Sequence, residues 1–87
     1  MLNKKKHHGQ PEVRADQVWK DNDPRFPDRY INIKEIKDGR AYYWTCLRFG
    51  GVTDWTLRSS DLKRFRGQKK GFSYHGEVLR NCEGGQN

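Results

Sequence analysis

The chain has 87 residues, of which 18 are Lys or Arg and 11 are Asp or Glu, so its formal net charge is +7. This length allows one domain with a modest core, and a hydrophobic fraction of 32% leaves no run near the roughly 20 apolar residues of a membrane span. No apolar segment follows the basic N-terminus, so the sequence predicts no secretory signal and favours a cytoplasmic protein.

The aromatic residues, three Trp, four Tyr and four Phe, lie between Trp19 and Tyr74. Because each can bury a large area, they favour a compact core there over the disorder that a charged fraction of 33% would suggest. We therefore expect one folded domain over residues 13–80, with a flexible basic arm over residues 1–12 and a flexible tail over residues 81–87.

A first strand is predicted within residues 13–20, followed by a loop in which two prolines exclude a helix. Three carboxylates of this loop region, Asp21, Asp23 and Asp28, form a cluster that a metal site could use. We favour a structural interpretation, in which they make turns beside proline and pair with Arg25 and Arg29.

The next strand, residues 29–37, carries two isoleucines that alternate onto one face, whereas Ile36 falls on the other. A bulge near Lys34 and Glu35 would restore the alternation. Asp38-Gly39 then predicts a type I′ hairpin turn, because both central residues of that turn need positive φ.

The third strand, residues 41–49, is rich in aromatic and β-favouring residues and ends at the predicted turn Gly50-Gly51. Alternation places five of its side chains inward: Ala41, Tyr43, Thr45, Leu47 and Phe49. Tyr42 and Trp44 then face outward, where they are candidates for stacking on unpaired bases.

The fourth strand, residues 53–58, alternates cleanly, which places Trp55 and Leu57 on one apolar face. With Trp19 and Phe65, Trp55 is assigned to the core. Residues 59–65 predict a single helical turn capped by Ser60 or Asp61, and residues 71–80 supply the last strand.

Five short antiparallel strands with one helical turn before the last strand predict an all-β fold. We expect a small, strongly bent, five-stranded SH3-like barrel, because closure removes the exposed edges of a flat sheet. An OB-like barrel is the alternative.

The stretch from Gln17 to Arg25 reads QVWKDNDPR, and the second half of the chain contains Leu57-Arg58, then DLKRFR from Asp61, then Gly71-Phe72. These segments resemble a signature of small uncharacterised bacterial and phage proteins, in which Gly-Gln-Val-Trp runs into Asp-x-Asp-Pro-Arg. The resemblance covers roughly residues 14–74 and departs from the signature at Asp16, where glycine is preferred. It implies a single small β domain, encoded by a phage or mobile element, with no assigned function.

Val18-Trp19 followed by Asp23-Pro24 is also similar, more loosely, to the first strand of MazF-like ribonuclease toxins. Those toxins are SH3-like barrels that use an Arg and a Ser or Thr at strand ends. The aliphatic strand after the loop has no Ser or Thr, and no phosphate-binding glycine loop, HExxH or GxSxG motif occurs. We therefore expect no enzymatic activity, with a MazF-like ribonuclease as an alternative.

Cys46 and Cys82 form no C-x-x-C pair, and the histidines His7, His8 and His75 show no ligand spacing. The sequence therefore predicts no metal ion and no other cofactor.

Positive charge is concentrated between residues 58 and 70, where six cations face one carboxylate, Asp61, giving a local charge of +5. The six are Arg58, Lys63, Arg64, Arg66, Lys69 and Lys70, and three more, Lys4, Lys5 and Lys6, lie in the N-terminal arm. A basic segment with a basic arm is typical of a protein that binds nucleic-acid phosphates. Within the segment, residues 67–71 predict a flexible hairpin tip that could follow a phosphate backbone.

The sequence thus favours a non-enzymatic, monomeric domain that binds DNA or RNA through these nine cations. The alternatives are a phage-encoded module that inhibits a host or defence protein through an acidic surface, and a charge run that is only solvated.

Overall fold

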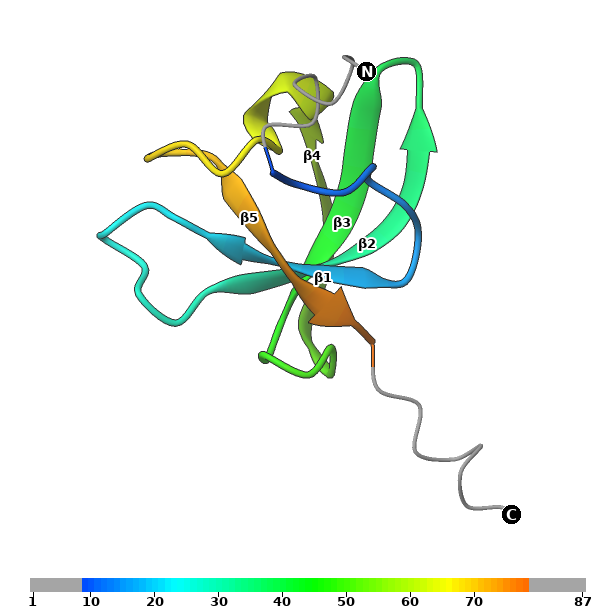
Figure 1. The fold of residues 1–87 in the computed structure, drawn as a ribbon. Helices are drawn as coiled ribbons and strands as arrows, with labels where there is room; N and C mark the ends of the chain where they lie inside the picture. The colour runs from blue at the N-terminus through cyan, green and yellow to red at the C-terminus, as the bar shows by residue number, and fades with distance from the viewer. Residues whose placement is uncertain (1–8, 79–87) are drawn as a thin grey trace.

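The structure, a computed structural model, describes residues 9–78 and consists of one five-stranded antiparallel sheet and a 3-10 turn. The elements are β1 (Gln17–Asp21), β2 (Tyr30–Lys37), β3 (Arg40–Cys46), β4 (Val52–Asp61), η2 (Leu62–Arg64) and β5 (Phe72–Glu77). The strand order is β4-β3-β2-β1-β5, and the sheet is strongly twisted and bent (Figure 1). These observations confirm the all-β prediction.

The order of the strands and the position of η2 are those of an SH3-like barrel. An OB-like barrel is a Greek-key arrangement in which β3 would lie beside β5, and that pair does not form among the described strands. Here β3 pairs with β2 and β4, and β5 pairs with β1. Because the two edge strands, β4 and β5, are not paired with each other, the barrel is open between them.

The first strand begins later than predicted, at Gln17, and the cause is the backbone of Asp16. Asp16 has φ 68, a left-handed conformation that interrupts an extended chain. The last strand is also shorter than predicted and ends at Glu77. The remainder of the predicted strand, residues 79 and 80, lies outside the described residues, as do residues 1–8 and 81–87.

The hairpin between β2 and β3 agrees with the prediction. Asp38 and Gly39 have φ 51 and φ 77, as a type I′ turn requires. The register shifts between Ile33 and Glu35, which confirms the bulge predicted near Glu35. Ile36 is nevertheless 37% exposed, because this end of β2 extends beyond the core.

Trp19 lies at the centre of the core and is fully buried, as predicted. Its ring packs edge-on against Phe65 at 5.1 Å and Tyr74 at 5.6 Å, and Phe65 stacks on Phe72 at 4.6 Å. The indole nitrogen of Trp19 donates a hydrogen bond to the side-chain oxygen of Gln17, at 2.9 Å. The core therefore depends on aromatic contacts between β1, β5 and the residue that follows η2.

The core prediction for Trp55 is wrong, because Trp55 is 69% exposed, and Leu57, which was placed on the same apolar face, is 46% exposed. Opposite them, the register shifts between Tyr43 and Thr45 of β3, so that residues 55–57 face Trp44 alone. Three residues opposite one form a large bulge, and a bulge breaks the alternation on which the prediction depended.

Leu47 and Phe49 were expected to point inward and are instead exposed. The third strand ends at Cys46, so both residues belong to the turn that leads into β4. That turn is closed by a hydrogen bond from the Leu47 amide to the Gly51 carbonyl, and Gly50 adopts φ 103. Glycines therefore form the turn as predicted, but the turn begins three residues earlier than a strand through Phe49 would allow.

In the part of the chain that the structure describes, no helix has the length and apolarity to cross a membrane.

Candidate nucleic-acid interface

The turn η2 positions the basic segment against the sheet. Asp61 is its N-cap, and the carboxylate of Asp61 accepts a hydrogen bond from the Lys63 amide at 2.8 Å, which agrees with the predicted cap. The Leu62 amide donates to the Gly39 carbonyl at 3.1 Å, and Leu62 packs against the core. These contacts fix the backbone of η2 against the sheet, so the positions from which the Lys63 and Arg64 side chains project are also fixed.

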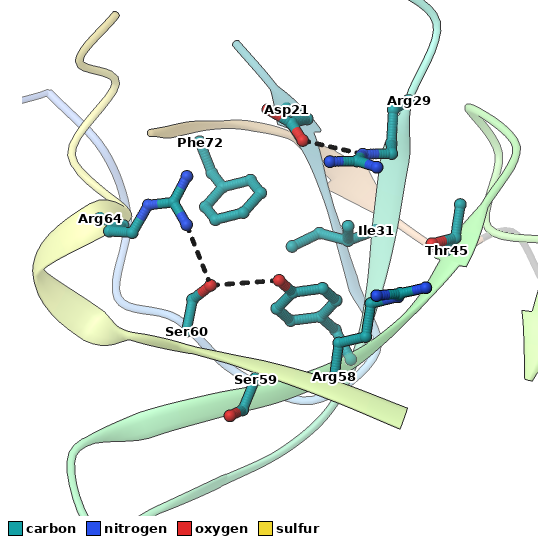
Figure 2. Close-up of a pocket in the computed structure, with 10 residues that line it drawn as sticks. Asp21, Arg29, Ile31, Thr45, Arg58, Ser59, Ser60, Arg64 and Phe72 are labelled. Carbon is teal, nitrogen blue, oxygen red and sulfur yellow. Dashed lines mark hydrogen bonds and ion pairs between the residues drawn. The ribbon is translucent and has the colours of Figure 1, made fainter. Parts of the chain in front are cut away.

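Arg64 is the most constrained of the predicted phosphate-binding residues. One terminal nitrogen donates to the Lys70 carbonyl at 2.7 Å, and the other donates to the Ser60 hydroxyl at 3.3 Å. The guanidinium also lies over the Phe72 ring, 4.9 Å from its centroid. Figure 2 shows Arg64 held between Ser60 and Phe72.

Residues 67–71, predicted as a flexible tip, are held by hydrogen bonds. The Gln68 side chain accepts from the Arg66 amide at 3.0 Å and donates to the Lys63 carbonyl at 2.9 Å. The Gln68 carbonyl accepts from the Asn22 side chain at 2.9 Å. At Gly71 an added Cβ would lie 2.3 Å from the Arg64 carbonyl oxygen, so only glycine allows this close approach.

A cavity of about 230 Å³ opens beside Arg64 and is lined by residues of both edge strands. Its polar lining includes three guanidinium groups and two hydroxyl groups, those of Arg29, Arg58, Arg64, Thr45 and Ser60. Ile31 and Phe72 form apolar parts of the wall (Figure 2). The structure thus brings together two predicted site residues, Arg58 and Arg64, with Arg29, which was predicted only as an ion-pair partner.

Arg29 does form the predicted ion pair. Its Nε donates to the carboxylate of Asp21 at 2.9 Å, and the Asp21 side chain is almost fully buried. The guanidinium of Arg29 also lies 3.8 Å from the centroid of the Phe26 ring. Sequence analysis missed its place in the cavity, because nothing in the sequence shows that the loop after β1 meets β4 in space.

The other predicted ion pair joins Arg25 to Asp23, with 2.6 Å between a guanidinium nitrogen and a carboxylate oxygen. Hydrogen bonds from the side chain and backbone of Arg25 hold the pKa of the Asp23 carboxyl well below its ordinary value. Within residues 9–78 no group of three His, Cys, Asp or Glu residues is placed to hold a metal ion. The contacts of Asp21 and Asp23 confirm the structural interpretation for these two carboxylates, whereas Asp28 makes no hydrogen bond or ion pair through its side chain within residues 9–78.

None of the six cations of the basic segment forms a salt bridge with a carboxylate among the residues that the structure describes. Five of them, Lys63, Arg64, Arg66, Lys69 and Lys70, lie on η2 and the loop to β5, and Arg58 lies on β4. All six residues are exposed. The three lysines of the predicted arm, Lys4, Lys5 and Lys6, lie outside the described residues.

The two predicted stacking residues, Tyr42 and Trp44, are both half-buried. Trp44 contacts the ring of the exposed Trp55, and the two centroids are 5.0 Å apart. Trp55 therefore presents the aromatic surface that was expected of Trp44. The sequence carries no signal for this exposure, because the alternation of Trp55 with Asp54, Thr56 and Arg58 is equally typical of a half-buried strand.

Comparison of the chain with protein-family models, with curated proteins and with solved structures found no match. The resemblance to the small phage and bacterial proteins stays a prediction, as does the looser likeness to MazF-like toxins.

Proposed function

We propose that this protein is a non-enzymatic domain that binds nucleic acid through the phosphate backbone. The observation that carries the proposal is the basic surface of η2, the η2–β5 loop and Arg58 of β4, where six exposed cations have no carboxylate partner among residues 9–78. A cation that is already paired with a carboxylate gains little from a phosphate. An unpaired cation can replace a counterion that is condensed on the nucleic acid, and the released counterion favours binding.

The shape of this surface is preorganised by hydrogen bonds that leave the charges free. The amide of Lys63 is held by Asp61, and the amide of Arg66 is held by Gln68, while both side chains are exposed. A fixed backbone with free cationic side chains reduces the ordering cost of binding. Lys4, Lys5 and Lys6 would add contacts from the N-terminal arm.

Aromatic groups supply a second kind of contact. Trp55, supported by Trp44, offers a ring face to an unpaired base, and Tyr42 lies beside Trp44 in β3. Base stacking on such rings is tolerant of sequence. We therefore favour single-stranded DNA or RNA over duplex as the ligand, in the cytoplasm of a bacterial host of a phage or mobile element.

The test is a titration of labelled single-stranded DNA, RNA and duplex DNA, followed by fluorescence anisotropy at about 50 and 200 mM NaCl. We expect binding that weakens with salt and is weaker still in a triple variant, Lys63→Gln, Arg66→Gln and Lys69→Gln. Each cation removed should reduce the slope of log affinity against log salt by about one unit. The matched control removes three exposed cations on other elements, Arg14→Gln, Lys34→Gln and Arg48→Gln.

Equal affinities of the triple variant and the control would contradict the assignment of the basic segment. An absence of binding at low salt would overturn the proposal altogether. That result would favour the alternative, an inhibitor of a host or defence protein, whose partner would be sought by pull-down.

A second candidate function, metal-independent RNA cleavage, is favoured by one observation. Arg29 and Thr45 line the same cavity, and an Arg with a Ser or Thr is the pair that the likeness to MazF-like toxins implies. Cleavage of a fluorogenic RNA in EDTA by the wild type, but not by Thr45→Val, would support this function. If the RNA stays intact when the protein is saturated with it, cleavage is excluded and nucleic-acid binding remains the proposed function.

A further inference from the structure

The cavity beside Arg64 has the size of a small anion site. Its volume is about 230 Å³. Pockets for whole small molecules usually begin near 300 Å³. The cavity therefore suits one phosphate group with little of the attached sugar, and any larger ligand must continue outside.

The charge of the cavity favours a dianion. Its charged lining residues are Arg29, Arg58, Arg64 and Asp21, so three positive charges and one negative charge leave a net charge of +2. A phosphate monoester carries about −1.5 to −2 at pH 7, whereas a phosphodiester within a strand carries a single negative charge. A monoester therefore matches this lining better than a diester.

Two of the three guanidinium groups are already oriented. Arg64 is held by the Ser60 hydroxyl, the Lys70 carbonyl and the Phe72 ring, and these contacts use only part of its five N–H donors. Arg29 is held through its Nε by Asp21, and its terminal nitrogens make no hydrogen bond among the described residues. Planar groups fixed in this way bind a phosphate in two-pronged fashion at low entropic cost.

Hydroxyl donors complete the lining. Thr45 and Ser60 supply these groups, whereas the Ser59 hydroxyl points away from the cavity (Figure 2) and accepts a hydrogen bond from Arg40 Nε at 3.1 Å. Ser60, which is buried, connects the Tyr43 hydroxyl at 3.1 Å to Arg64. Because Ile31 and Phe72 form apolar walls, charge-assisted hydrogen bonds within the cavity are stronger than on open surface.

We propose that this cavity binds a terminal phosphate monoester, and, resting on the proposed function, that the monoester is the phosphorylated end of a nucleic-acid strand. To place an internal phosphate in the cavity, the strand would have to enter the cavity and also leave it. A terminal phosphate requires room for the strand on one side only. The Lys70 carbonyl accepts a hydrogen bond from Arg64, which places the η2–β5 loop beside the cavity. The exposed cations of this loop then contact the phosphates that follow the strand end.

The test compares the same 12-nucleotide single strand with a 5′-phosphate, a 3′-phosphate or hydroxyl groups at both ends, at one salt concentration. We expect one of the phosphorylated strands to bind about tenfold more tightly, in line with charge-assisted hydrogen bonds. Inorganic phosphate should reduce that affinity to the level of the hydroxyl strand. Thymidine monophosphate bound as tightly as the phosphorylated strand would make a free nucleotide the source of the monoester.

Two single-charge variants locate the effect. Arg58→Gln removes a cation that lines the cavity and makes no hydrogen bond through its side chain within residues 9–78. It should abolish the preference for the phosphorylated end. Lys69→Gln removes an exposed cation outside the cavity and should weaken all strands equally. If Arg58→Gln does not fold, the comparison of strands by the wild type still decides the proposal.

The outcomes separate this inference from the proposed function. Equal, salt-sensitive binding of phosphorylated and hydroxyl strands would overturn the monoester site and leave nucleic-acid binding intact. If neither strand binds, but thymidine monophosphate shifts the amide resonances of Ser59 and Ser60, the monoester site is supported and the proposed function fails. If neither the strands nor the mononucleotide bind, both are wrong.

Discussion

The ring of Trp55 packs edge-on against the ring of Trp44, with 5.0 Å between the centroids and 68° between the planes. Trp44 is half-buried in the sheet, whereas Trp55 is 69% exposed. The half-buried ring of Trp44 therefore supports the ring of Trp55 and holds a free aromatic face at a fixed angle on the molecular surface.

Replacement of Trp55 by alanine should separate stability from binding. We expect Trp55→Ala to lower the free energy of unfolding by about 1 kcal/mol, since only one aromatic contact is lost, and to weaken single-strand binding by about 1–3 kcal/mol. Trp19→Ala, at the fully buried position, should cost about 3–5 kcal/mol of stability. Urea unfolding and anisotropy titrations measure both quantities. Unchanged binding by a folded Trp55→Ala protein would exclude stacking on this ring.

The hydroxyl groups of Ser60 and Tyr43 should be energetically coupled, because they lie 3.1 Å apart in a buried environment. Ser60→Ala leaves the Tyr43 hydroxyl without this partner and should cost about 1–3 kcal/mol, while Tyr43→Phe should cost about 0.5–1.5 kcal/mol. The double variant should cost less than the sum of the two. Additive costs in urea unfolding would show that this hydrogen bond does not form in solution.

Acid should destabilise the protein partly through Asp23. The pKa of its carboxyl is held below the ordinary 3.8 by Arg25, so the unfolded chain binds the proton first as the pH falls. The stability from this pair is present above pH 3.8 and is lost as the pH falls further. We expect Asp23→Asn to flatten the acid limb of a plot of melting temperature against pH.

Asp28→Asn is the matched control for that experiment. Asp28 lies in the same loop and accepts no hydrogen bond from a side chain or amide within residues 9–78. A parallel flattening in both variants would show that the acid limb does not depend on the contact between Arg25 and Asp23.

Cys46 should be unreactive in the folded protein. Burial raises the pKa of its thiol to about 12, and the side chain is almost inaccessible. In a Cys82→Ser variant, where Cys46 is the remaining thiol, iodoacetamide should label the protein slowly at pH 8 and rapidly in urea. Equally fast labelling in both conditions would show that β3 opens readily.

Local signals in the sequence were reliable where the chemistry is local. Asp38-Gly39 determines its turn through backbone conformation, and Asp61 caps η2 with its own side chain. The exposure of Trp55 could not be predicted, because it depends on how many residues of β4 lie opposite Trp44. That number is set by the pairing of two strands, which a pattern within one strand does not contain.

The candidate site shows the same division. The density of cations in residues 58–70 is a property of the sequence, and Arg58 and Arg64 were found by it. Arg29 was assigned correctly to an ion pair with Asp21, but its position in the cavity depends on the barrel bringing the start of β2 opposite β4. Contacts between distant segments of this kind need the fold.

The bulge of β4 also has a consequence for the behaviour of the protein in concentrated solution. An edge strand with a regular row of unpaired amides and carbonyls recruits strands from other molecules and leads to fibrils. In β4 that row is interrupted at residues 55–57, and the Thr56 amide is occupied by the carboxylate of Asp54 at 2.9 Å. The irregularity that exposes Trp55 thus also interrupts the row of groups with which a strand of another molecule would pair, so we expect this edge to resist self-association.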